Sequence, residues 1–469
     1  MRKIVAILMV TFLLMSVLAG CIGSGEPAGS TTTPTTAADV NSDSNGGEEG
    51  GEVNDKPFAG RKITYAVSET GAMGAEQLAI VDMVREKTGI EIEFVIVPIT
   101  AAGEVDKLLV MLQAGDSLDI LYGATPKLKM YQSAGVLDAI DELAAAEGYD
   151  MESIFGASLP VLDDGKTYGL PAFNDVWLTL YNKQLFDNKG VEYPSMDGFT
   201  WDKYIELAGR VTDIENGVYG SYMLDYDCYN YMLAFQKGAK PYKADGTANF
   251  DDPLFKESIE FFYSLGNDRK IQPDAIDIAA GTYPWNGFFS QGNMGMFVIG
   301  GWATSMMSDM EKYPREWTVG IAPMPYPDGF NPSTLAVTGC YAIPTTSQNK
   351  DVAFEAIKCI AENQYALGHG RVPARIDLTD EEVLAYIEET MIPTFAFDGI
   401  TAEDIKKCWF DPQRQILSEK IVGTADTQLN NIFKEEGQMY GQKNQSIEDT
   451  MTKIQDRAAQ AIQEALLAS

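Results

Sequence analysis

The sequence predicts an α/β protein with two lobes, and three observations lead to that prediction. Short apolar runs of strand type alternate with stretches of helical spacing, which is typical of an α/β sheet. The segment from about Phe58 to Ser469 is too long for one hydrophobic core and suits two. The stretch before it, residues 22–57, is composed mainly of Gly, Ser, Thr, Pro and acidic residues, which favours a solvated, flexible tether.

The first 21 residues predict export. Arg2 and Lys3 precede an apolar run that is shorter than the roughly 20 residues of a membrane-spanning helix. Leu18-Ala19-Gly20-Cys21 then supplies the small residues of a cleavage site. We expect residues 1–21 to be a lipoprotein signal peptide, with Cys21 acylated and the protein held at the outer face of the cell membrane. The alternative is an ordinary secretory signal that happens to contain a cysteine.

The folded segment opens with five elements in alternating order. The patterns predict a strand at 62–67, a helix at 75–87, a strand at 91–97, a helix at 105–113 and a strand at 118–122. In the first helix the residues expected to face the core are Leu78, Ile80, Val81 and Val84, and Gly89 ends it. This order predicts a parallel sheet, in which ligands bind beyond the carboxyl ends of the strands. We therefore expect the loops 68–70 and 122–124 to line a cleft.

Near the C-terminus, residues 446–467 show helical spacing. The apolar positions expected to face a core are Ile447, Met451, Ile454, Ala458, Ile462 and Leu466.

Composition excludes several classes of function. With 68 Asp and Glu against 35 Lys and Arg, the net charge is -33, which disfavours nucleic acid as a partner. His369 is the only histidine and the cysteines are widely spaced, so we expect no metal site and no cofactor. Cys340 and Cys359 form one candidate disulfide pair, whereas Cys228, Cys340, Cys359 and Cys408 could equally be free and buried. A carboxylate-based glycosidase stays open, although no pair of acids stands out.

A series of short motifs then follows in a recognisable order and spacing. The stretches that carry it are 112–119 (LQAGDSLD), 131–137, 164–171 (DGKTYGLP), 181–186 (YNKQLF), Thr200-Trp201, 289–296 (FSQGNMGM), 300–303 (GGWA), 339–344 and the helix at 350–362. Together they resemble the extracellular solute-binding proteins of ABC importers, particularly the branch that binds sugars. Leu118 stands where that family usually has proline.

The resemblance implies a two-lobe periplasmic-binding-protein-like (type 2) fold, with a hinge of several crossings and a ligand cleft between the lobes. It assigns residues 58–173 and 336–375 to the first lobe and residues 174–335 and 376–469 to the second. The implied partners are a small solute, in this branch a mono- or oligosaccharide, and the permease subunits of an ABC importer. We expect a monomer that is not an enzyme and that meets the membrane only through its lipid anchor.

The candidate ligand-binding residues combine aromatic rings with polar groups, because a sugar ring offers an apolar face to stack on and hydroxyls to bond. By the resemblance, Trp302 stacks on the sugar and Asp175 binds hydroxyls, while Tyr341 and Arg371 fall at hinge crossings, where the alternatives are packing and an ion pair between the lobes. Further candidates at expected strand ends and loops are Tyr122, Phe173, Trp177, Tyr226, Tyr229 and Trp285. Trp201 is expected to be structural. A non-sugar solute such as a peptide or polyamine remains the alternative ligand.

Overall fold

The computed structural model describes residues 56–68, 74–98, 106–162, 164–223, 225–284, 286–367 and 371–468. Residues 1–55, and with them the predicted signal peptide and Cys21, lie outside the described residues, as do Trp285 and His369.

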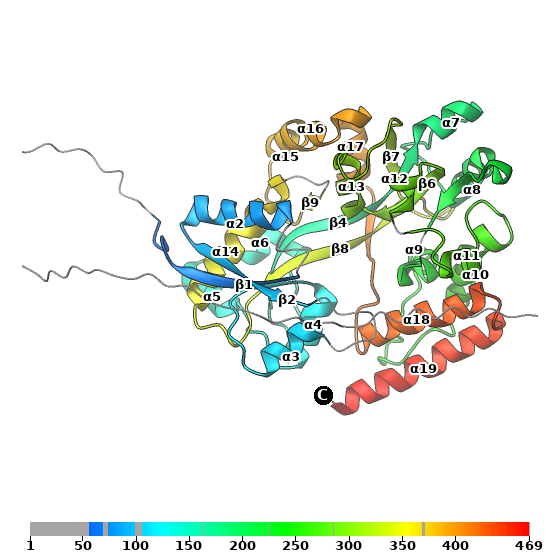
Figure 1. The fold of residues 1–469 in the computed structure, drawn as a ribbon. Coiled ribbons are helices and arrows are strands. Elements are labelled where there is room, and N and C mark those ends of the chain that lie inside the picture. The colour runs from blue at the N-terminus through cyan, green and yellow to red at the C-terminus, as the bar shows by residue number, and fades with distance from the viewer. Residues whose placement is uncertain are drawn as a thin grey trace, which may run out of the picture. The chain divides into compact units, whose positions relative to one another are not determined.

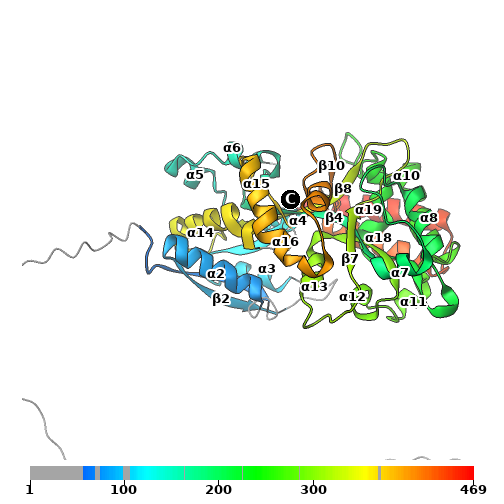
Figure 2. The same cartoon turned by 90° about the horizontal axis from the view of Figure 1, so that it is seen from above.

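The first lobe is built on a parallel pair of strands covered by helices. Strand β1 (Lys62–Ser68) pairs with β2 (Glu91–Val97) in register along its whole length. Figure 2 shows α2 and α14 side by side on this lobe. Its helices are α2 (Ala75–Thr88), α3 (Lys107–Gln113), α4 (Thr125–Ser133), α5 (Asp141–Glu147), α6 (Met151–Phe155) and α14 (Lys350–Asn363). The first four elements therefore match the sequence prediction in type and order.

The third strand differs from its prediction in place and partner. The chain bridges to β1 in parallel at Ile120 only, and β3 (Leu121–Ala124) then pairs antiparallel with β8 (Ser333–Ala342). The buried carboxylate of Asp119 accepts hydrogen bonds from the backbone N and the Oγ1 of Thr64, at 2.8 and 3.0 Å. These bonds replace the ladder bond that Leu118 would make with Thr64, so the parallel pairing with β1 is confined to Ile120. From Leu121 onward the strand pairs with β8 instead.

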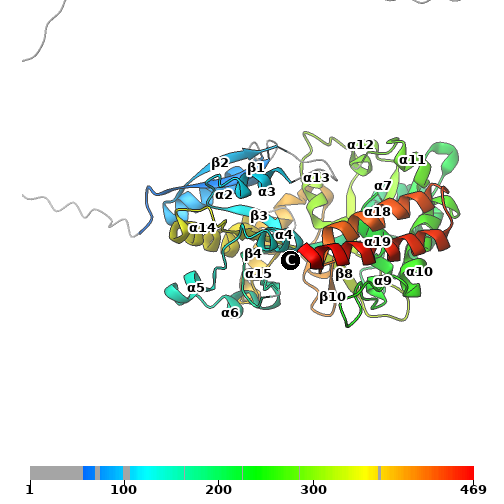
Figure 3. The same cartoon turned by 90° about the horizontal axis from the view of Figure 1, so that it is seen from below.

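The second lobe carries the larger core, and Figure 3 shows its helices α18 and α19 side by side. Its strands are β5 (Tyr219–Tyr222), β6 (Met294–Gly300), β7 (Val319–Pro323) and β10 (Gln415–Ser418). Its helices are α7 (Lys183–Lys189), α8 (Trp201–Val211), α9 (Met232–Gln236), α10 (Pro253–Asn267), α11 (Ala275–Ala279), α12 (Gly287–Gln291), α13 (Thr304–Ser308), α15 (Asp380–Tyr386), α16 (Ile392–Thr394), α17 (Ala402–Trp409), α18 (Asp426–Gly441) and α19 (Ile447–Ala468).

Two long strands run from one lobe into the other (Figure 1). The first part of β4 (Leu170–Asn182), up to Val176, pairs with β8, and the part from Trp177 onward pairs with β6 and β7. On its other edge, β8 pairs with β3 through 339–342 and with β10 through 333–336, so Val337 and Thr338 lie between the two partners. A short strand, β9 (Val372–Pro373), adds a third crossing beside β4.

The buried apolar residues separate into cores that follow this division. Phe173 belongs to a core of the first lobe and Val176 to the core of the second, while Ala336 and Cys340 mark the return. The exact limits of the lobes stay a prediction, which these switches support. A hinge at the strand crossings follows from this arrangement, because few elements join two separately packed cores.

Several sequence expectations have clear outcomes. In α2, Ile80 and Val84 are buried as predicted, but Leu78 is exposed because it turns away from the sheet. In α19, Leu466 was also expected to face the core but is exposed, because it lies near the end of the helix. Trp201 is buried and donates a hydrogen bond to Gln236, as its structural role predicts. Cys228, Cys340, Cys359 and Cys408 are all free and buried, so the candidate disulfide is not formed.

Candidate functional site

The first half of the candidate site is a group of rings on the crossing strands. Tyr122 of β3 stacks on Phe173 of β4 with ring centres 6.2 Å apart, and its ring also lies 5.4 Å from that of Tyr341 of β8. Gly339 makes this packing fit, since a Cβ there would lie 2.5 Å from the Phe173 ring and 2.9 Å from the Tyr122 hydroxyl. Phe173 and Tyr341 are buried, whereas 38% of Tyr122 is exposed, so Tyr122 offers the open ring surface of the group.

A cavity of about 560 Å³ lies beside Tyr122, where the carboxyl ends of β1 and β2 meet. Ser68 and Tyr122 line it, as the sequence predicts for the first residues of the two loops, while Glu69 and Thr70 lie outside the described residues. The other lining residues are Tyr65, Ala66, Val67, Gln77, Val97, Pro98, Asp106, Leu108 and Lys127. Asp106 and Lys127 form an ion pair of 3.3 Å in this wall.

Arg371 lies at the third crossing, and its guanidinium is bound by other residues of the protein. Its guanidinium lies 4.0 Å from the centre of the Phe173 ring and pairs with the carboxylate of Glu76 in α2, where Nη2 donates over 3.2 Å. Burial lowers the pKa of Arg371 to about 10. By the predicted bounds Arg371 and Glu76 both belong to the first lobe, so this ion pair lies within one lobe and not between the two. The carbonyl of Arg371 accepts a hydrogen bond from Tyr386 at the end of α15, in the second lobe.

The second half of the site centres on Trp302 and Asp175. Trp302 lies in the turn η4 (Gly301–Ala303) after β6, and its backbone N donates to Oδ1 of Asp175 over 2.8 Å. Gly300 allows the indole to fold back, because a Cβ there would lie 2.5 Å from Trp302 Nε1. The ring of Tyr226 meets Trp302 edge-on at 6.3 Å. The structure thus brings Asp175, Tyr226 and Trp302 together.

Asp175 has an unusual protonation state. Burial, and secondarily the nearby charge of Glu419, raises the pKa of Asp175 to about 8. The side chain is therefore mostly a neutral carboxylic acid at pH 7, which can donate a hydrogen bond as well as accept one.

Sequence reasoning missed Glu419 and Lys420, which follow β10. Glu419 accepts a hydrogen bond from Trp177 Nε1 over 2.8 Å, and Lys420 pairs with Asp227 over 2.6 Å. No motif marked these residues, because the family resemblance ends well before them. Tyr65 and Glu76 were missed too, although Tyr65 stands near the carboxyl end of a predicted strand, where an aromatic residue could have been flagged.

The remaining predicted residues line the interior of the protein. Trp177 and Tyr229 meet edge-on at 5.5 Å, and Tyr229 also stacks on Phe262. Trp177, Tyr229, Phe173 and Tyr341 are all at most 2% exposed, so their rings support the site from behind in this structure. Direct contact of these four with a ligand stays a prediction, as does that of Trp285.

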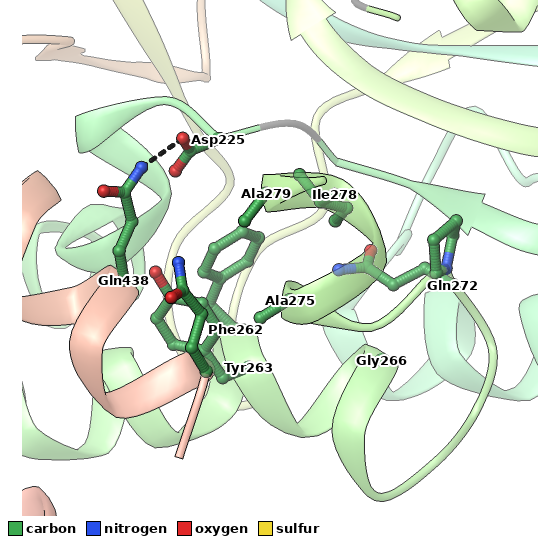
Figure 4. A pocket seen from close by; sticks show the side chains of 11 residues that line it. Asp225, Phe262, Tyr263, Gly266, Gln272, Ala275, Ile278, Ala279 and Gln438 are labelled. Atoms are coloured by element: carbon green, nitrogen blue, oxygen red, sulfur yellow. Dashed lines mark hydrogen bonds between the residues drawn. The ribbon is translucent and has the colours of Figure 1, made fainter. Parts of the chain in front are cut away.

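A second, smaller cavity lies in the second lobe between α10, α11 and α18. Figure 4 shows Asp225 and Gln438 joined by a hydrogen bond at one side, with Phe262 and Tyr263 below them. Its volume of about 20 Å³ has room for a single water molecule. This cavity is far too small for a sugar ring, so it is not the ligand site.

Comparison with known proteins identifies the family. The family model described as bacterial extracellular solute-binding protein matches residues 42–367, well over half of the chain. The chain belongs to this family. In this solute-binding protein the matched region contains the crossing strands β4 and β8 and most of the residues gathered around Tyr122 and Trp302.

Individual relatives of this solute-binding protein are distant. A putative binding protein of Brucella abortus is 24% identical over 289 residues, which are 60% of this chain and 66% of that one. An arabinooligosaccharide-binding protein of Halalkalibacterium halodurans is 22% identical over 62% of this chain and 65% of its own. The alignments thus span slightly less than two thirds of these curated relatives.

Solved structures show the same fold. An ABC substrate-binding protein of Listeria monocytogenes, in complex with cycloalternan, superposes with a TM-score of 0.70 over 86% of this chain and 99% of that one, at 19% identity. The two-lobe prediction is therefore confirmed at the level of fold. Among the residues that the structure describes, no helix has the length and apolarity needed to cross a membrane.

Proposed function

We propose that this protein is the substrate-binding lipoprotein of an ABC importer, which captures a carbohydrate outside the cell and delivers it to the permease. The observation that carries this proposal is the gathering of Tyr122, Asp175 and Trp302 where the strands cross between the lobes. Exposed ring surface beside hydroxyl-binding carboxyls is the combination that a sugar ring requires. The sugar-binding relative and the cycloalternan complex add support by similarity.

The proposed mechanism is capture by lobe closure. The sugar stacks on Trp302, and Asp175 binds its hydroxyls. Arg371 donates a further hydrogen bond to a sugar hydroxyl from its Nε, which is buried and has no partner among the described residues. Its terminal nitrogens keep the ion pair with Glu76 meanwhile. The lobes then rotate about the crossing strands, and the closed, occupied form is the one that the permease accepts.

Charge pairing around the site favours an uncharged ligand over a peptide or polyamine. Arg371 pairs with Glu76, Lys127 with Asp106, and Lys420 with Asp227. Asp175 is mostly neutral at pH 7. Glu419 shares Lys420 with Asp227 and is, among the described residues of this group, the one carboxylate without a cation of its own. A polyamine carries several charges, and burying a charge without a partner is costly.

The cellular placement is part of the same proposal. Cleavage before Cys21 and acylation of that cysteine would hold a monomer at the outer face of the membrane, with residues 22–57 as the tether. The protein binds its ligand without changing it. The rival of another class is an exported glycosidase.

A thermal-shift panel tests the proposed function. Mono- and oligosaccharides, amino acids, peptides and polyamines are added to the protein well above micromolar concentration. We expect one group of sugars to raise the melting midpoint by several degrees, because a ligand that binds only the folded state stabilises it. Chromatography of that sugar afterwards should show it intact. A shift with polyamines or peptides alone, or cleavage of the sugar, would contradict the proposal.

A further inference from the structure

Glu419 occupies a fixed position between the two halves of the site. Its backbone N donates to the carbonyl of Ala336 over 2.9 Å, and its own carbonyl accepts from the Tyr231 hydroxyl at 3.1 Å. Two residues on, Ile421 N donates to Asn430 in α18 over 3.1 Å. The segment is therefore held both to the crossing strand β8 and to the second lobe.

Neighbouring residues orient the side chain of Glu419, and its carboxylate can still accept further hydrogen bonds. Oε2 accepts from Trp177 Nε1 at 2.8 Å, and Oε1 lies 3.3 Å from Lys420 Nζ. Each carboxylate oxygen has two lone pairs, so both oxygens keep room for another donor. The side chain is 13% exposed, unlike the fully covered indole behind it.

The carboxyl group of Asp175 interacts electrostatically with this side chain. The burial of Asp175 and the charge of Glu419 together raise the pKa of Asp175. Tyr122 on β3 also interacts electrostatically with Asp175, and Lys420 pairs with Glu419. The geometry links the two acids through the tryptophans: Trp302 N donates to Asp175, Trp177 Nε1 donates to Glu419, and both indoles lie beside Gly300. The site thus presents a carboxylic acid and a carboxylate, which differ in what they can bind: the acid donates and the carboxylate accepts.

We infer that Glu419 is a specificity-determining residue of the proposed binding site, where its carboxylate accepts a hydrogen bond from a ligand hydroxyl next to the one that Asp175 binds. This inference rests on the proposed function. The acid and the carboxylate together select a polyol with neighbouring hydroxyls, since one hydroxyl accepts while the next donates. A ligand without a donor at the second position leaves the Glu419 carboxylate desolvated without a new partner, which opposes binding.

The test compares Glu419→Gln with Glu435→Gln, a matched loss of charge on the exposed surface of α18. Glu435 pairs with Arg457 and is 58% exposed at its side chain. The full chain in detergent is titrated calorimetrically with glucose, mannitol, maltotriose, arabinotriose and cycloalternan. For the sugar that the unmodified protein binds best, we expect Glu419→Gln to raise Kd by about 10- to 100-fold and Glu435→Gln to leave it unchanged.

A pH series separates recognition from a structural effect. In the unmodified protein Kd should rise between pH 7 and 9, because Asp175 loses its proton and two carboxylates then face the ligand. In Glu419→Gln this rise should begin at lower pH, since the pKa of Asp175 falls without the neighbouring charge. An unchanged Kd for Glu419→Gln, or a pH profile of Glu419→Gln identical to that of the unmodified protein, overturns the inference while the function stands. Failure of the unmodified protein to bind any sugar overturns both.

Discussion

Replacing Asp398 with alanine is expected to lower the free energy of unfolding by about 3–5 kcal/mol, because it leaves a buried positive charge without its partner. Asp398 Oδ2 lies 2.6 Å from Arg315 Nη2, and the two side chains are 1% and 0% exposed. The other carboxylate oxygen accepts from the backbone N of Val319 at 2.7 Å. The substitution therefore leaves both the Arg315 guanidinium and the first backbone N–H of β7 without the Asp398 carboxylate as a partner.

The matched control is Asp197→Ala, which breaks an ion pair of almost the same length on the surface. Asp197 pairs with Lys407 over 2.7 Å but is 78% exposed at its side chain, so water screens the pair and little or no change in the free energy of unfolding is expected. Guanidinium denaturation and thermal melting of both variants measure the difference. Equal effects of the two substitutions would show that burial does not control the strength of this interaction.

Replacing Trp302 with alanine is expected to weaken sugar binding by about 30-fold, the effect of losing about 2 kcal/mol at a dominant aromatic contact. The indole packs against Tyr226 and folds back over Gly300 beside Asp175. The Asp175 contact uses the backbone N of residue 302 and so survives the substitution. The calorimetric Kd measures the loss of ligand affinity, and the melting midpoint of the free protein measures separately the packing that is lost with the indole.

Trp317→Ala is the control for that experiment. Trp317 is also a partly buried tryptophan of the second lobe, but it packs on Phe288 and Arg315 away from the crossing strands. Calorimetric titration with the best sugar should give an unchanged Kd for this variant. A Trp302→Ala protein that binds as tightly as Trp317→Ala would remove Trp302 from the site.

Local patterning predicted the start of the fold well, and long-range pairing was where it failed. The alternation in β1 and the stop at Gly89 depend on neighbouring residues alone, so the sequence shows them. The partner of β3 is β8, which lies more than two hundred residues later in the chain. No local pattern carries that information.

The candidate site was predictable only where a family motif marked it. Trp302 and Asp175 were named from the motif resemblance, and the structure places them in contact. Glu419 lies beyond the last motif. It comes to lie beside Trp177 because β10, which precedes it, pairs with β8. Arg371 was placed at a crossing, but its partner Glu76 lies in a helix of the opposite end of the chain. Contacts of this kind are set by topology and not by spacing.

Small-angle X-ray scattering of the protein with and without its best sugar tests the central claim most directly. Closure about β4, β8 and β9 moves the two lobes together, so the account predicts a smaller radius of gyration at saturating sugar. The same sugar should have no such effect on Trp302→Ala at a concentration that saturates only the unmodified protein. An unchanged radius of gyration in the unmodified protein, at a concentration where calorimetry shows full occupancy, would contradict capture by lobe closure.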